Sequence, residues 1–264
     1  MKFCVFASGS SGNCTLVSDG TTRLLVDCGI SCRRIAGHLR DLGVNPESLA
    51  GVCVTHDHVD HVSGLATFHK RFPGVPLYAT DGTRACVACR EGCGDLPWRV
   101  FAPGCDFEVG TIQVHAFATP HDAGDSVGFV FRDASGALLG YATDLGYVPA
   151  MVQQRLCGCQ ALILESNHDR TMLRNSGRPW SLIERIAGNS GHLSNEQSAE
   201  LVDALASGPA LRTLVLAHLS GECNTPAEAL GTHLATLRRR GREGAVRVVV
   251  ASPDVPTPVL EVLP

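Results

Sequence analysis

Short apolar runs of strand length alternate along the chain with longer segments whose apolar residues recur at helical spacing. Turn residues such as Asp19-Gly20 and Asp133–Gly136 predict antiparallel hairpins. Helix starts of the capping-box form occur at Ser194 and Thr225. We expect strands over 2–7, 14–18, 23–27, 52–55, 75–79, 99–102, 106–109, 111–118, 127–132, 137–142, 161–165, 212–217 and 246–251, and helices over 31–42, 64–72, 80–90, 148–157, 194–206 and 225–240. This order predicts an α+β fold in one domain over 1–264, a four-layer αββα sandwich with two sheets face to face and helices outside.

The composition is that of a globular protein with a sizeable core, because 44% of the 264 residues are hydrophobic and 18% are charged. No apolar run approaches the ~20 residues of a membrane span, and the stretch after Lys2 is too short for a signal peptide. We therefore expect a cytoplasmic protein that does not enter a membrane. The net charge of −4 argues against indiscriminate nucleic-acid binding. Two divalent ions would nevertheless add about four positive charges at a site.

Most of the twelve cysteines are expected to be free, buried thiols, because disulfides are typical of small secreted chains. Cys86, Cys89 and Cys93 recur at i, i+3 and i+7, which places them on one face of a helix, with Cys105 further on. A structural zinc site there is one interpretation. We favour a stripe of buried thiols acting as small apolar side chains.

The densest polar cluster is Thr55-His56-Asp57-His58-Val59-Asp60-His61, which directly follows the apolar run Val52–Val54. Imidazole nitrogens and carboxylate oxygens are ligands for Zn²⁺ or Mn²⁺, and an apolar core would exclude such a group. His56 and His58 point the same way if the segment is extended. Asp60 and His61 follow where a helix is expected and can therefore face a second ion. A helical His-Glu-x-x-His zinc site does not fit this spacing, and a solvated polar loop is the less favoured alternative.

Other ligand-type residues follow apolar strands, directly before turns. His121 follows the strand over 111–118, Asp144 follows 137–142, and His218 follows 212–217. Each alone is typical of a capping residue at the end of a strand, but together they predict ligands that converge on the cluster. Asp27 also ends a strand before a glycine turn; it is suited either to orient a ligand histidine or to cap the turn.

The chain resembles the metallo-β-lactamase superfamily, whose His-x-His-x-Asp-His motif is present as His56, His58, Asp60 and His61. Within that superfamily, the segments 6–13, 165–169 and 191–195 resemble the YycJ/WalJ group of cytoplasmic exonucleases that act on DNA. The resemblance implies two divalent metal ions, Zn²⁺ or Mn²⁺. It places one ion on His56, His58 and His121 and the other on Asp60, His61 and His218. It implies that Asp144 bridges the two ions and that Asp27 orients a ligand histidine.

The resemblance also implies a phosphodiesterase, most simply a 5′-to-3′ DNA exonuclease in which two ions convert a bridging water to hydroxide for in-line attack on phosphate. Asp60 is expected to accept a proton, and His168 and His192 to donate to substrate oxygens. Backbone and side-chain contacts to phosphate are expected from Ser10, Ser11, Asn13 and Arg178. The arginines Arg170, Arg174, Arg178 and Arg185 form either a basic strip for a nucleic-acid backbone or a solvated face.

The cluster itself does not select phosphate as the substrate. A small-molecule hydrolase of the same fold, of the thioesterase or lactonase type, is the alternative enzyme. A metal-dependent binding module is the alternative outside catalysis, and the complete set of ligand-type residues disfavours it. DNA is the favoured nucleic acid over RNA.

Overall fold

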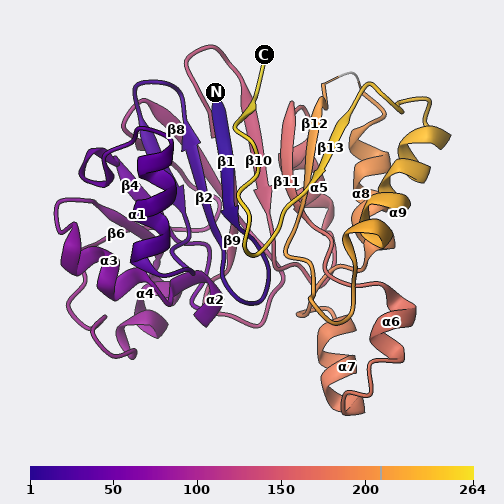
Figure 1. Cartoon of the computed structure of the whole chain (residues 1–264), viewed down its shortest axis with the longest axis horizontal. Helices are drawn as coiled ribbons and strands as arrows, with labels where there is room; N and C mark the ends of the chain where they lie inside the picture. Colours follow the sequence, from indigo (N-terminus) through magenta and orange to yellow (C-terminus); the bar gives the residue numbers. More distant parts are fainter. Residues whose placement is uncertain (209) are drawn as a thin grey trace.

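Two seven-stranded sheets pack face to face in the computed structural model, which describes residues 1–208 and 210–264 (Figure 1). The first sheet has the strand order β14-β1-β2-β3-β4-β5-β6 and the second β13-β12-β11-β10-β9-β8-β7. The first contains β1 (Lys2–Ala7), β2 (Cys14–Ser18), β3 (Arg23–Val26), β4 (Gly51–Cys53), β5 (Leu77–Thr80), β6 (Trp98–Phe101) and β14 (Leu260–Glu261). The second contains β7 (Asp106–Val109), β8 (Ile112–Ala118), β9 (Val127–Arg132), β10 (Leu138–Ala142), β11 (Ala161–Glu165), β12 (Thr213–Ala217) and β13 (Arg247–Val250).

The space between the sheets is filled by apolar side chains from both, including Phe3, Val17, Phe129 and Phe131. Alternation along β1 sends Phe3 and Val5 into this central core, whereas Cys4 and Phe6 face the outer helices. Burial on both faces therefore explains why the strands consist of nearly continuous apolar residues.

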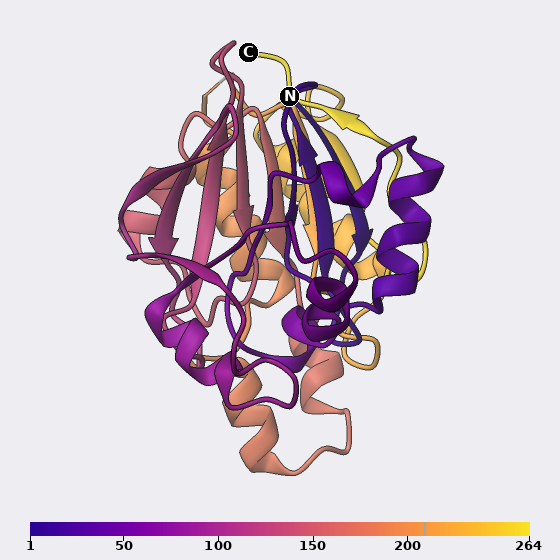
Figure 2. The ribbon, with the colours of Figure 1, turned by 90° about the vertical axis from the view of Figure 1, so that its left-hand side faces the viewer.

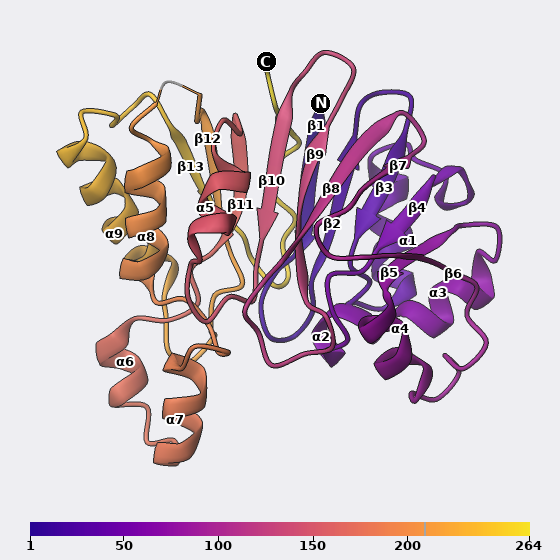
Figure 3. The same cartoon turned by 180° about the vertical axis from the view of Figure 1, so that it is seen from behind.

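Helices cover the outer face of each sheet, as the views from the side and from behind show (Figures 2 and 3). On the first sheet lie α1 (Cys32–Asp41), α3 (Leu65–Arg71) and α4 (Asp81–Ala88), with the short η1 (Pro46–Ser48) and α2 (Val59–Val62) nearby. On the second lie α5 (Ala150–Leu156), α8 (Asn195–Leu205) and α9 (Pro226–Arg239). The predicted four-layer αββα sandwich is confirmed.

Several local predictions differ from the structure. The helices α6 (Arg170–Arg174) and α7 (Trp180–Ala187) were not predicted. The five residues of α6 are too few to show a helical repeat. The eight residues of α7 were missed although the equally long α4 was predicted. Ser194 forms the predicted capping box with Gln197. Thr225 forms only half of one, because its own N–H donates to the side chain of Asn224.

The prediction that Cys86, Cys89 and Cys93 form a buried stripe on one helix is also wrong. The helix α4 ends at Ala88, before Cys89 and Cys93. Cys86 and Cys89 are exposed, and only Cys93 of the three is buried. A glycine-rich stretch after residue 90 prevents the helix from continuing, so the i, i+3, i+7 spacing never forms a single face.

Parallel pairing directs many strand ends to one edge of the sandwich. In the first sheet β3 and β4 are parallel, and in the second β10, β11 and β12 are parallel. Strand β9 is antiparallel to both β8 and β10, so β8 and β10 run in the same direction. Their carboxyl ends lie at the lower edge in Figure 1, opposite the chain termini. Among residues 1–208 and 210–264, no helix has the length and apolar character needed to cross a membrane.

Candidate metal centre

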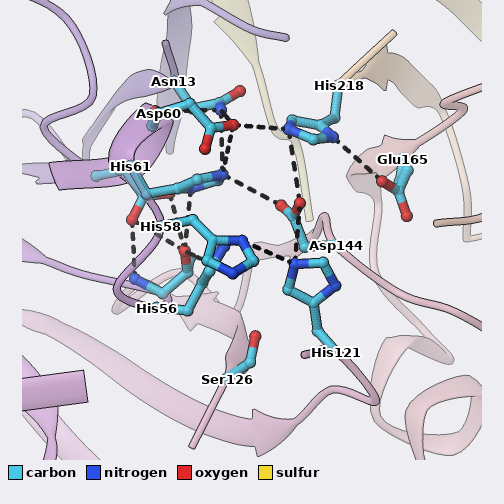
Figure 4. A network of polar contacts seen from close by, with 12 residues as sticks. Asn13, His56, His58, Asp60, His61, His121, Ser126, Asp144, Glu165 and His218 are labelled. Carbon is cyan, nitrogen blue, oxygen red and sulfur yellow. Dashed lines mark hydrogen bonds and ion pairs between the residues drawn. The ribbon is translucent and has the colours of Figure 1, made fainter. Parts of the chain in front are cut away.

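Polar side chains gather at this lower edge because six strands end there with a ligand-type residue within a few positions. These are Asp27 after β3, the His56–His61 segment after β4, His121 after β8, Asp144 after β10, Glu165 at the end of β11, and His218 after β12. Figure 4 shows the side chains pointing toward one another from both sheets. The structure thus brings His121, Asp144 and His218 to the His56–His61 segment, as their positions after strands predicted.

Three of these residues have left-handed backbone conformations. The φ angles of Asp27, Asp144 and His218 are 61°, 62° and 55°. Non-glycine residues with positive φ are uncommon, and such strain is concentrated at functional sites. Each strand therefore ends in a sharp change of direction that turns a polar side chain into the centre.

One group of donors consists of three imidazoles. His56, His58 and His121 place one ring nitrogen each within 4.8 Å of one another. His121 Nε2 lies 3.2 Å from His58 Nδ1. The ring centroids of His56 and His58 are 4.7 Å apart. The extended segment from His56 to His58 places both rings on one side, as the two-residue spacing predicted.

A second group combines two imidazoles with a carboxylate. Asp60 and His61 lie in α2, and the group is completed by His218. Asp60 Oδ2 is 3.1 Å from His218 Nε2 and 3.4 Å from His61 Nε2. Asp144 lies between the two groups, since its Oδ1 is 3.7 Å from His121 Nε2 and its Oδ2 is 3.3 Å from His61 Nε2.

The outward nitrogens of the ligand-type histidines are bonded to protein acceptors. His61 Nδ1 lies 2.8 Å from Asp27 Oδ2, and His218 Nδ1 lies 3.2 Å from Glu165 Oε1. His121 Nδ1 donates to the carbonyl oxygen of Gly191 at 3.0 Å. Nearby carboxylates raise the pKa values of His61 and His218, so a bound cation would have to displace the proton on Nε2 of each. The bonded Nδ1 would keep its proton, and the lone pair of Nε2 would then be directed into the centre.

Two buried atoms in the centre have no hydrogen-bond partner among the described residues, His56 Nε2 and Asp144 Oδ2, although Asp144 Oδ2 lies within ion-pair distance of His61 Nε2. A buried polar atom without a partner costs free energy, so its retention calls for an explanation. Both atoms are of ligand type and both face the clustered donors. The residues present therefore fit a centre for divalent ions with nitrogen and oxygen ligands.

The two groups differ in electrostatics. Burial, reinforced by the neighbouring His61 ring, lowers the pKa of His56 well below its usual value. Burial also opposes charge on His61, but the carboxylates of Asp27 and Asp144 outweigh it and raise the pKa of His61 to about 10. Burial would raise the pKa of Asp60, yet hydrogen bonds from His218 and His61 hold it below its usual value. The second group thus holds carboxylates ionised and attracts positive charge.

Glu165 belongs to the centre although it was not among the predicted site residues. Its Oε1 lies 2.8 Å from His192 Nδ1, and its Oε2 accepts from the N–H groups of Leu145 and Leu193. Glu165 follows an apolar run just as Asp144 does, so the same position after a strand was a signal for it. Its carboxylate holds His192 beside Asp144, at 3.6 Å from Nδ1 to Oδ1.

The predicted catalytic histidines have different surroundings. The side chain of His192 is 21% exposed at the edge of the centre. His168 is buried, belongs to none of the donor groups in the described residues, and has an Nδ1 without a partner. Burial lowers the pKa of His168 to about 4, so its ring is neutral at pH 7.

The residues predicted to contact phosphate lie in three different surroundings. Ser10 and Ser11 are exposed and line a cavity of about 480 Å³ together with Leu219 and Ser220, which directly follow His218. Asn13 is buried within the network, where its Nδ2 lies 3.2 Å from Asp60 Oδ2. Arg178 lies away from these residues in sequence and forms an ion pair of 2.9 Å with Glu222.

Several known proteins resemble this chain in sequence or in architecture. Residues 22–219 match the family model described as the beta-lactamase superfamily domain. The chain is 32% identical to the exodeoxyribonuclease WalJ of Streptococcus pneumoniae serotype 2, over 99% of this chain and 98% of that protein. It is 33% identical to the exodeoxyribonuclease YycJ of Bacillus anthracis, over 85% of this chain and 84% of that protein. The crystal structure of the metallo-β-lactamase fold protein YhfI from Bacillus subtilis has the same fold, with a TM-score of 0.69 at 18% identity over 97% of this chain and 99% of that one.

Proposed function

The chain belongs to the metallo-β-lactamase superfamily of metal-dependent hydrolases, and on that premise we propose that it is a dinuclear DNA exonuclease. One observation carries the proposal: ligand-type residues from both sheets converge at one edge, in a chain that aligns over nearly its whole length with an exodeoxyribonuclease. Because the site takes residues from both sheets, we also propose that 1–264 acts as one domain. The cytoplasmic location stays a prediction from the sequence.

We assign one ion to His56, His58 and His121 and the other to Asp60, His61 and His218, with Asp144 shared between them. The outward hydrogen bonds of His61, His121 and His218 support this assignment, because with Nδ1 so held each of these rings would direct the lone pair of Nε2 inward. Zn²⁺ and Mn²⁺ both suit nitrogen and oxygen donors. Two such ions, when bound, would lower the pKa of a water and offset the charge of a scissile phosphate.

The protein's own groups would orient the reaction and move its protons. Asn13 and His218 hold Asp60 through Oδ2, which leaves Oδ1 to accept a proton from the attacking water. Glu165 holds His192 through Nδ1, which leaves Nε2 to donate a proton to the leaving oxygen. We assign this donor role to His192 in preference to His168, because His168 is buried and neutral.

Recognition of the strand is proposed for the cavity beside His218. Ser10 and Ser11 are exposed there, so their hydroxyl groups are available to phosphate or sugar oxygens. Asn13 would act indirectly, by holding Asp60. Arg178 would have to exchange its ion pair with Glu222 for a phosphate, which makes it the weaker of these contacts.

A substrate panel tests the proposal. Single- and double-stranded DNA with a label at either end, RNA of the same sequence, and a thioester are incubated with protein freed of metal and then supplied with Mn²⁺ or Zn²⁺. We expect mononucleotide release from DNA only after metal is added, in the 5′-to-3′ direction. Cleavage that survives chelation would contradict the metal centre, and hydrolysis of the thioester alone would favour a small-molecule hydrolase.

A further inference from the structure

Helices α6 and α7 and the loop between them form a projection from the edge of the sandwich that carries the ligand-type residues (Figures 1 and 2). We call residues 169–191 the helical projection. Both of its ends lie at the centre. His168 forms an isolated β-bridge with Ser194 just outside the projection. The carbonyl oxygen of Gly191, at the other end, accepts from His121.

The projection is anchored to the body of the protein. Leu173 and Ile183 pack with Cys223 in a small core of their own. Arg185 forms an ion pair of 2.7 Å with Asp122, the residue after His121. These contacts fix the direction of the projection relative to the centre.

Trp180 begins α7, where the loop from α6 enters the helix, and its side chain is 64% exposed. The chain contains two tryptophans, and the other, Trp98, is half-buried. No described residue contacts the Trp180 ring in an aromatic or cation–π pair. A large exposed ring without a partner is costly to leave in water and is typical of a binding surface.

The projection is also basic in an acidic chain. It contains four arginines against Asp169 and Glu184, a formal charge of +2 where the whole chain has −4. Three of the four form ion pairs with carboxylates outside the projection: Arg170 with Glu196, Arg178 with Glu222 and Arg185 with Asp122. Arg174, at the end of α6, is exposed and has no ion pair in the described part of the chain. The unpaired charge of Arg174 is complementary to a phosphate backbone.

We propose that the helical projection docks single-stranded nucleic acid, with Trp180 stacking on a base and Arg174 attracting the backbone, an inference that rests on the proposed nuclease function. Stacking tolerates any sequence, as an exonuclease requires. It also requires an unpaired base, because base faces are covered in a duplex. The projection therefore selects single strands and leads them toward the edge that carries the centre.

Binding of an oligothymidylate of about 20 nucleotides, made resistant to cleavage by phosphorothioate linkages, tests the docking without catalysis. Fluorescence anisotropy gives the affinity, and quenching of tryptophan emission reports stacking. We expect Trp180→Ala to weaken binding about 10-fold and to abolish quenching, and Trp180→Phe to bind nearly as the wild type does. Trp98→Phe is the matched control and should leave both affinity and quenching unchanged. Arg174→Gln should reduce the slope of log affinity against log salt by about 1.

Turnover of a small phosphodiester, bis-p-nitrophenyl phosphate, should be unchanged in Trp180→Ala, because the ring does not reach the reacting atoms. Equal oligonucleotide affinity in Trp180→Ala and wild type would overturn the inference. So would loss of small-substrate turnover, or self-association that requires Trp180 in sedimentation experiments. If the wild type cleaves no phosphodiester but still binds single strands through Trp180, the nuclease proposal fails while the docking surface stands.

Discussion

His233 and His56 are both buried imidazoles, but their nitrogens have different surroundings. In α9, His233 Nδ1 donates to the carbonyl oxygen of Ala229 at 2.8 Å, and Nε2 lies 3.0 Å from Ser198 Oγ. His56 has only Thr55 as a partner at Nδ1, and its Nε2 has none among the described residues. Burial therefore does not identify a ligand. The neighbours of the ring distinguish the two: His56 Nε2 has no partner and its ring lies against those of His58, His61 and His121. The ring of His115 also has a buried Nε2 without a partner, but it belongs to none of the donor groups in the described residues.

The backbone and the electrostatics extend this comparison. His233 lies in regular helix, whereas Asp27, Asp144 and His218 have left-handed φ angles. Burial alone lowers the pKa of His233 to about 4, against a small opposing effect of its bond to Ala229. At the centre, burial would also lower the pKa of His61, but the carboxylates of Asp27 and Asp144 outweigh it and raise this pKa to about 10. Left-handed backbone conformations and closely paired charges characterise the candidate metal centre, whereas both ring nitrogens of His233 are hydrogen-bonded within regular structure.

The largest expected effect comes from the carboxylate shared by both donor groups. Asp144→Asn should lower turnover of DNA by at least about 10⁴-fold, since general acid–base catalysis alone contributes 10²–10⁴-fold and the metals are expected to contribute more. The asparagine tolerates the left-handed backbone, so the fold should survive. Turnover and metal content measured together check this. The control is His233→Gln, which changes a buried group outside the centre and should cut DNA at the wild-type rate. A near-normal rate in Asp144→Asn would show that Asp144 is not part of the catalytic centre.

An intermediate effect is expected on stability below neutral pH. His233 is neutral in the folded protein down to about pH 4, while in the unfolded chain it takes up a proton near pH 6.5. The unfolded state therefore binds more protons between these values, and the free energy of unfolding falls as the pH drops from 6.5 to 4, by about 3 kcal/mol. His233→Gln cannot titrate, so urea denaturation at pH 8 and pH 4 should show that this part of the pH dependence is lost. An unchanged pH dependence in the variant would mean that the buried ring is protonated in the folded protein.

The smallest expected effect concerns an outward nitrogen of the centre. Asp27→Asn weakens the acceptor 2.8 Å from His61 Nδ1 and should reduce metal affinity about 10-fold, at the lower end of the range for such partners. Competition with a chromophoric chelator measures this affinity. Asp106→Asn is the matched control, because Asp106 also pairs with a histidine, His115, but at an exposed position outside the centre. Equal affinities in both variants would show that the Asp27 contact has no role in metal binding.

Much of the architecture was predictable because it depends on local patterns. Apolar runs of strand length determined most of the strands, and the capping box at Ser194 determined where α8 begins. The His56–His61 segment was recognisable because all its donors lie within six consecutive residues. His121, Asp144 and His218 were each predicted from one feature, a polar residue directly after an apolar strand.

The tertiary structure alone decided which groups meet across the chain. Glu165 contacts His192 and His218, Gly191 accepts from His121, and Arg178 pairs with Glu222. It also left Cys86 and Cys89 exposed, and it placed Trp180 on a projection built from two helices that were not predicted. Periodicity and spacing describe neighbours along the chain, whereas these contacts join residues brought together only when the sheets pack. The sequence by itself therefore determined the layers and most of the ligand-type residues, and packing determined how each is held.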